Sequence, residues 1–167
     1  MTESSSRASK PRTLAVGIGS PHGDDQIGWA VMRELALMLP GDVGVKTAIQ
    51  PAELLNWLQD VDQLIICDAC QADGVTGEIH RWQWPTKSIA TCKHAGSHDL
   101  SLPFVLSLAD RLGKLPQRVV VWGIELGDAS PGAPLSDAVR SAIPKLVQLL
   151  IEDLQIMSSR LEPTSHA

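Results

Sequence analysis

The sequence has no long apolar run and no run of basic residues. A helix that spans a bilayer needs roughly 18 consecutive apolar residues, and no stretch of this chain approaches that, so we expect no membrane insertion. The formal net charge is -5. Because phosphate backbones are bound through basic faces, this charge balance argues against a nucleic-acid partner.

Cysteine, tyrosine and phenylalanine are also scarce. The chain has three cysteines, no tyrosine and one phenylalanine. An odd number of cysteines, behind a polar opening MTESSSRASKPR without a hydrophobic signal region, favours reduced thiols and a cytoplasmic location. Five tryptophans supply most of the aromatic bulk, and we expect Trp29 and Trp122 to be buried.

The length of 167 residues suits a single domain that buries most of its apolar surface without cross-links. We expect a disordered tail over 1–12, one domain over 13–159 and a second tail over 160–167. No internal repeat is evident.

Strands are expected to alternate with helices along this domain. Apolar runs predict buried strands over 13–19, 62–69 and 118–124, and 43–49 reads as a further strand. The alternating segment over 77–84 predicts an edge strand or hairpin arm. Apolar spacing and capping signals predict helices over 26–39, from Pro51, over 100–112 and over 136–158. This order is typical of an α/β fold, a three-layer sandwich with a central, largely parallel sheet flanked by helices on both faces.

Two helix boundaries are less sharply defined by the sequence. Ser97 or Asp99 is the expected N-cap of the helix over 100–112, and Gly113 follows its end. In the C-terminal helix, Pro144 either sets a kink or begins the helix proper.

Polar residues of three segments are expected at the carboxyl edge of the sheet, where such folds bind ligands. The segments are 17–28 (GIGSPHGDDQIG), 65–70 (IICDAC) and 97–103 (SHDLSLP). They contain several carboxylates and imidazoles, side chains that suit a borderline divalent cation such as nickel or zinc.

In this order and at these spacings, the three segments resemble the endopeptidases that mature nickel-iron hydrogenases. The resemblance runs from about residue 13 to the C-terminal helix. It implies an α/β sandwich in which Asp25, Asp68 and His98 are the metal ligands and the catalytic residues. Two positions depart from the family pattern: the family often has glutamate at the position of Asp25 and usually has asparagine at that of Ser20.

The resemblance also implies an activity. The enzyme would be an aspartyl-type or metal-dependent endopeptidase that removes the C-terminal extension of a nickel-iron hydrogenase large-subunit precursor after nickel insertion. The nickel would arrive with the precursor, and it would either polarise the scissile carbonyl or activate a water, with Asp25 or Asp68 as a base. We expect a monomer, since the protease must enclose the tail of its partner.

Two other functions fit the same three residues. A nickel-sensing chaperone or binding module would hold the precursor without cutting it, and a general metal hydrolase would act on small amides.

The individual residues also have structural alternatives. Asp24 or Asp25 can cap the first helix, and we favour ligation for Asp25 and capping for Asp24. Asp68 can accept hydrogen bonds from backbone amides, and His98 can be a polar residue near a helix start. For His22 and His94, beside the expected cleft, a structural or solvent role is favoured over a place in the substrate channel.

The cysteines and glycines permit further alternatives. Cys67 and Cys70 form a CxxC pair, but Cys67 falls inside an apolar strand and is expected in the core. A zinc site from Cys70, Cys92, His94 and His98 matches no standard spacing. A nucleotide loop from Gly17, Gly19 and Gly23 is disfavoured, because the third glycine comes one residue late and no acid ends the second strand.

Overall fold

The computed structural model describes residues 12–91 and 100–159. Five strands form one sheet in the order β2-β1-β3-β5-β4. Their bounds are Thr13–Ile18 (β1), Val43–Ala48 (β2), Gln63–Cys70 (β3), Ile79–Gln83 (β4) and Arg118–Glu125 (β5). All neighbouring pairs are parallel except β4 with β5, which puts an antiparallel strand at one edge. The predicted, largely parallel sheet and its edge strand are confirmed.

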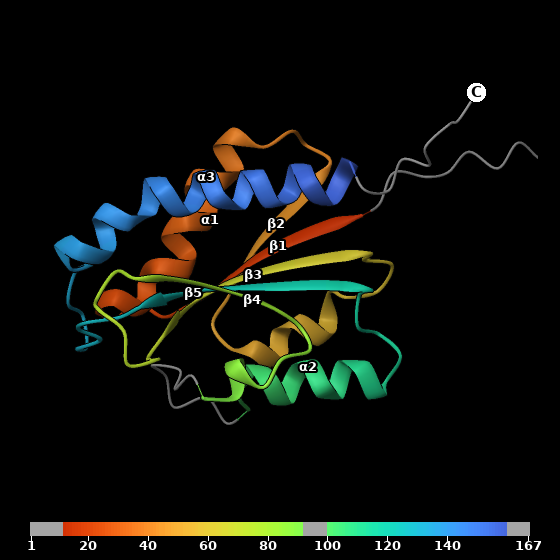
Figure 1. The fold of residues 1–167 in the computed structure, drawn as a ribbon, viewed down its shortest axis with the longest axis horizontal. Coiled ribbons are helices and arrows are strands. Elements are labelled where there is room, and N and C mark those ends of the chain that lie inside the picture. Colours follow the sequence, from red (N-terminus) through yellow and green to blue (C-terminus); the bar gives the residue numbers. More distant parts are fainter. Residues whose placement is uncertain (1–11, 92–99, 160–167) are drawn as a thin grey trace, which may run out of the picture.

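Helices cover both faces of this sheet (Figure 1). The α-helices are Ile27–Met38 (α1), Leu102–Arg111 (α2) and Asp137–Ser159 (α3), and 3-10 helices span Gly23–Gln26 (η1), Pro51–Asn56 (η2) and Ser88–Thr91 (η3). α1 and α3 lie together on one face, and α2 and η2 lie on the other. The three-layer sandwich is therefore confirmed. Within the described part of the chain, no helix is long and apolar enough to cross a membrane.

The central strands are apolar on both sides because each side meets a different helix layer. In β3, Ile65 and Cys67 pack in the cluster that contains the buried side chains of α1 and α3. Leu64 and Ile66 pack in the other cluster, with the buried side chains of α2. Successive side chains of a strand point to opposite faces, so burial on both faces gives the continuous apolar run seen in the sequence.

The start of α1 sits directly on the strands. A Cβ added to Gly28 would lie 2.1 Å from the carbonyl oxygen of Ile18 and 2.8 Å from that of Cys67. Only glycine allows this approach. The contact fixes η1, just before α1, over the carboxyl ends of β1 and β3.

Several predicted boundaries need correction. The segment that begins at Pro51 is a 3-10 helix, not an α-helix. Neither Ser97 nor Asp99 is the N-cap of α2: Ser101 is, since its hydroxyl accepts a hydrogen bond from the Phe104 amide at 3.4 Å. Pro144 lies inside α3 and does not begin it. The predicted tails lie outside the described residues, Arg12 excepted.

The two tryptophans expected in the core differ. Trp122 is buried, as predicted. Trp29 is only half-buried, because its indole nitrogen reaches the carbonyl oxygen of Ala48 at 2.9 Å near the end of β2.

Candidate functional site

The connections between strands reverse direction at the carboxyl ends of β1 and β3, the place where open α/β sheets have their ligand crevice. After β1 the chain passes to β2 on one side, and after β2 it returns to β3 on the other side of β1. Ligands of parallel α/β sheets bind at such a point of reversal. Asp25 lies in η1 after β1, and Asp68 lies near the end of β3, so both predicted carboxylates flank this crevice.

Asp25 is held by its backbone. Its amide donates to the carbonyl oxygen of His22 at 3.1 Å, and its own carbonyl oxygen accepts from the Ser20 amide at 3.2 Å. The residue is only 2% exposed, and its Oδ2 is buried without a hydrogen-bond partner among the described residues. A buried carboxylate oxygen is costly unless a donor or a cation faces it. The donor set at Asp25 therefore fits a cation.

Asp68 lies on the face of the sheet that α2 covers. It is 3% exposed, and strand alternation places it on the same side as Leu64 and Ile66, which pack with α2. Its register partner in β5 is Gly123, which has no side chain. The space over Gly123 is taken by the Trp82 ring and Cys70 Sγ, which a Cβ at this glycine would meet at 2.5 and 2.9 Å.

The third predicted ligand, His98, lies outside the described residues, as do Cys92 and His94. In the sequence His98 precedes α2, the helix on the Asp68 face. The grouping of Asp25, Asp68 and His98 as metal ligands and catalytic residues stays a prediction.

Asp24, next to Asp25, has a different environment. Its Oδ2 accepts from the amides of Gly127 at 2.8 Å and Asp128 at 3.0 Å and from the Ser136 hydroxyl at 2.9 Å. Its Oδ1 accepts from the Ser136 amide at 2.7 Å. We call Asp24, Gly127, Asp128 and Ser136 the Asp24 anchor. It ties the turn after β1 to the loop between β5 and α3.

These hydrogen bonds decide the protonation of Asp24. Burial alone would raise the pKa of this carboxyl, but the amides of Asp128, Ser136 and Gly127 and the Ser136 hydroxyl together lower it below its ordinary value. Asp24 is therefore a charged structural residue.

The prediction that Asp24 caps the first helix is wrong, and capping by Asp25, the alternative to ligation, is not seen either. Neither the N-cap of η1, His22, nor that of α1, Gln26, makes a side-chain capping bond, and the side chain of Asp24 points to the distant loop instead.

The same turn makes further contacts with the β5–α3 loop. His22 Nδ1 accepts from the Gly132 amide at 3.1 Å, which gives His22 a structural contact. Gly23 has a φ of +54°, and a Cβ there would lie 2.1 Å from the Asp128 carbonyl oxygen. Only glycine fits this position without strain.

Cys67 is not a candidate nucleophile. The thiol is fully buried in the core, as predicted. Burial raises its pKa well above the ordinary value, and the nearby negative groups of Asp68 and Cys70 raise it further. A thiol in this state gives no thiolate near neutral pH.

Sequence reasoning missed two residues beside Cys70. It considered Cys92, His94 and His98 as partners of Cys70, but the described structure places His80 and Glu125 there. The available signal was the alternation over 77–84, which puts His80 on one side of its strand together with Trp82.

Comparisons with known proteins agree with this architecture. The family model described as hydrogenase maturation protease (HycI) matches residues 47–153, more than half of the chain. A comparison with curated protein sequences gives no match.

Three solved structures illustrate the likeness. The hydrogenase maturating endopeptidase HybD from E. coli is 23% identical with a TM-score of 0.75, over 87% of this chain and 93% of that chain. The [NiFe] hydrogenase maturation protease HycI from Thermococcus kodakarensis KOD1 is 22% identical with a TM-score of 0.68, over 89% and 95%. The hydrogenase 2 maturation peptidase from a Thaumarchaeota archaeon is 26% identical with a TM-score of 0.64, over 86% and 98%.

Proposed function

This chain belongs to the hydrogenase maturation protease family, and on that premise we propose that it removes a C-terminal extension from the large-subunit precursor of a nickel-iron hydrogenase once nickel has been inserted. The observation that carries the proposal is the buried Asp25 Oδ2, which faces no hydrogen-bond donor among the described residues and lies at the crevice that Asp68 also flanks.

In this proposal the nickel belongs to the substrate and is not a resident cofactor. Asp25, Asp68 and His98 would contact it when the precursor docks at the carboxyl edge of the sheet. Two carboxylates offset the charge of a divalent cation, and an imidazole suits nickel. A precursor without nickel would bring no cation to the buried Asp25 Oδ2, so we expect the protease to distinguish the two forms.

Peptide hydrolysis needs a polarised carbonyl and a deprotonated water. The nickel of the precursor supplies the positive charge that favours both. A carboxylate oxygen of Asp25 or Asp68 that does not contact the nickel would accept the proton of the water and then return it to the departing amine. The high pKa of Cys67 argues against a thiolate nucleophile in its place.

The test uses nickel-loaded and nickel-free precursor, each incubated with the full chain and weighed by intact mass spectrometry. We expect loss of a C-terminal peptide from the loaded form alone, and no loss with His98→Ala at an unchanged melting temperature. Binding without loss of mass would support a nickel-sensing chaperone, and cleavage of unrelated peptides with added zinc would support a general amide hydrolase. Either result would overturn the proposal.

We further propose that the protease acts as a monomer in the cytoplasm. The buried thiol of Cys67 in the core suits a reducing compartment.

A further inference from the structure

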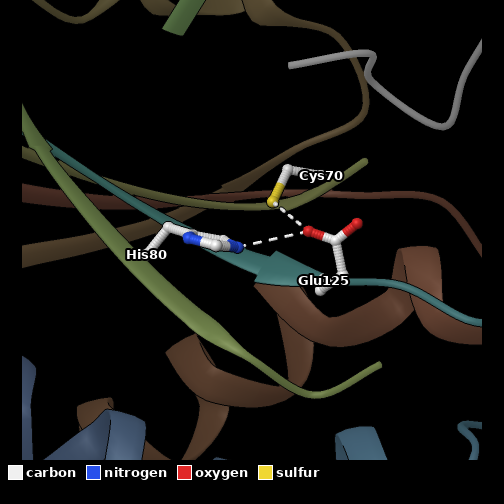
Figure 2. A group of neighbouring side chains, drawn as sticks. All are labelled: Cys70, His80 and Glu125. Atoms are coloured by element: carbon white, nitrogen blue, oxygen red, sulfur yellow. Dashed lines mark hydrogen bonds and ion pairs between the residues drawn. The ribbon is translucent and has the colours of Figure 1, made fainter. Parts of the chain in front are cut away.

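A second group of metal-ligating side chains lies on the Asp68 face of the sheet. Cys70, His80 and Glu125 come from β3, β4 and β5, and their ligand atoms all lie within 4.8 Å of one another (Figure 2). We propose that these three residues form a second metal site, for a thiophilic divalent cation such as zinc. The proposal does not depend on the proposed protease activity.

The strand register brings the three residues together. Cys70 and Glu125 are direct partners across β3 and β5, and His80 is paired with Gly123 across β4 and β5. A Cβ at Gly123 would lie 2.9 Å from Cys70 Sγ and 2.5 Å from the Trp82 ring. The absence of a side chain at Gly123 therefore makes room for the Cys70 thiol and for the Trp82 ring, on which the His80 imidazole stacks.

The distances suit a tetrahedral ion. Glu125 Oε2 is 3.2 Å from His80 Nε2 and 3.9 Å from Cys70 Sγ. With zinc bonds of about 2.0 to 2.3 Å, ligand atoms in a tetrahedral site lie roughly 3.3 to 3.8 Å apart. Small side-chain rotations bring the three atoms to that spacing.

Neighbouring groups already orient two of the ligands. The Ala72 amide donates to Glu125 Oε1 at 2.9 Å, so this oxygen can stay anchored when Oε2 turns to a cation. The His80 ring stacks on Trp82, with ring centroids 5.4 Å apart, which fixes the plane of the imidazole. Such supporting contacts raise the metal affinity of a site because they hold its ligands in place.

Charge and access also agree with a cation. A thiolate and a carboxylate balance a divalent ion, and the Cys70 proton leaves to solvent when the sulfur binds. Cys70 and Glu125 are buried, but the His80 side chain is 21% exposed and offers a route for entry. Sulfur, nitrogen and oxygen donors together select zinc or nickel over magnesium or calcium.

Cobalt(II) is the probe, because a sulfur ligand gives a thiolate-to-cobalt charge-transfer band in the near ultraviolet. The predicted Asp25, Asp68 and His98 site has no sulfur and gives no such band. We expect the full chain to show the band with one equivalent of cobalt, and zinc to displace it. Cys70→Ser should lose it, and His80→Gln should weaken cobalt binding at least about tenfold, since even supporting residues cost that much.

Two matched controls should keep the band. Asp25→Asn changes the other predicted site, and Cys92→Ser removes a thiol from outside the described residues. No band in the full chain, a band that survives Cys70→Ser, or a band lost in either control would overturn the proposal. If circular dichroism shows that Cys70→Ser does not fold, the His80→Gln variant provides the test. Unchanged cobalt affinity in His80→Gln would mean that Cys70, His80 and Glu125 are joined by hydrogen bonds and do not bind a metal.

Discussion

The Asp24 anchor and the candidate site begin at neighbouring residues of one turn, and their carboxylates differ in how they are compensated. Asp24 is 0% exposed and Asp25 is 2% exposed, so burial does not distinguish them. Asp24 accepts four hydrogen bonds from the β5–α3 loop. Asp25 Oδ2 accepts none from the described residues. We infer that a buried carboxylate whose charge is compensated by hydrogen bonds within the protein has a structural role. A buried carboxylate oxygen that faces no donor of the protein is instead available to a ligand.

Asp153 supports this distinction from another part of the molecule. It is also buried, and its carboxylate binds Arg81 through two hydrogen bonds of 2.9 Å and Trp122 Nε1 through one of 3.0 Å. It lies in α3, away from the strand ends. The Asp153 carboxylate, like that of Asp24, is therefore compensated by hydrogen bonds within the protein and has a structural position.

The largest expected effect comes from Asp25→Asn, which removes the charge at the candidate site. We expect kcat/KM for processing of nickel-loaded precursor to fall at least about 1000-fold, or roughly 4 kcal/mol. The melting temperature should not fall, because a neutral amide is less costly to bury than a carboxylate. Asp60→Asn, an exposed carboxylate, is the matched control and should leave both quantities unchanged. If Asp25→Asn processes the precursor normally, Asp25 has no role in activity, and the proposed functional difference between Asp24 and Asp25 is wrong.

Asp24→Ala should show the opposite pattern. It leaves the amides of Gly127, Asp128 and Ser136 without their acceptor, so we expect a loss of about 3 kcal/mol in the free energy of unfolding. For a chain of this size, that lowers the melting temperature by roughly 6 to 12 °C. Calorimetry measures the shift. An unchanged melting temperature would mean that the Asp24 anchor contributes little to stability.

The smallest effect is the pH dependence of the Asp24 anchor. Because the folded pKa of Asp24 lies below its ordinary value of 3.8, folding favours the charged form, and this stability is fully present above that value. It is lost as the pH falls below 3.8 toward the folded pKa, at up to about 1.4 kcal/mol per pH unit. Urea unfolding should therefore show that Asp24→Ala costs less at pH 3 than at pH 7. An equal cost at both pH values would contradict the lowered pKa.

The strands could be predicted well because both faces of the sheet are buried. In a chain of this length, a short continuous apolar run such as that of β5 is typical of a strand buried on both sides. The shorter helical pieces were harder. Pro51 gave a correct start for η2, but few of its side chains are buried, so little packing supports further turns. At α2, Ser97 and Asp99 were the expected caps, and only the three-dimensional start of the helix selects Ser101.

Site residues could be predicted only where the signal is local. Asp25 and Asp68 each follow an apolar run, which places them at the carboxyl edge from sequence alone. The donors to Asp24 lie 103 to 112 residues away in the chain, and a single sequence gives no means of pairing them. The same holds for Cys70 with Glu125, which only the register of β3 and β5 brings together.

The length of the loop that the Asp24 anchor closes has a consequence for folding order. The turn after β1 is synthesised early. Its Asp24 carboxylate, however, accepts a hydrogen bond from the Ser136 amide at the start of α3, which is synthesised 112 residues later. Contacts between such distant segments form late, because closing a long loop costs chain entropy first. Asp25 therefore gains its final position only after β5 and the start of α3 have been made, so a nascent chain that ends before Ser136 lacks a finished site.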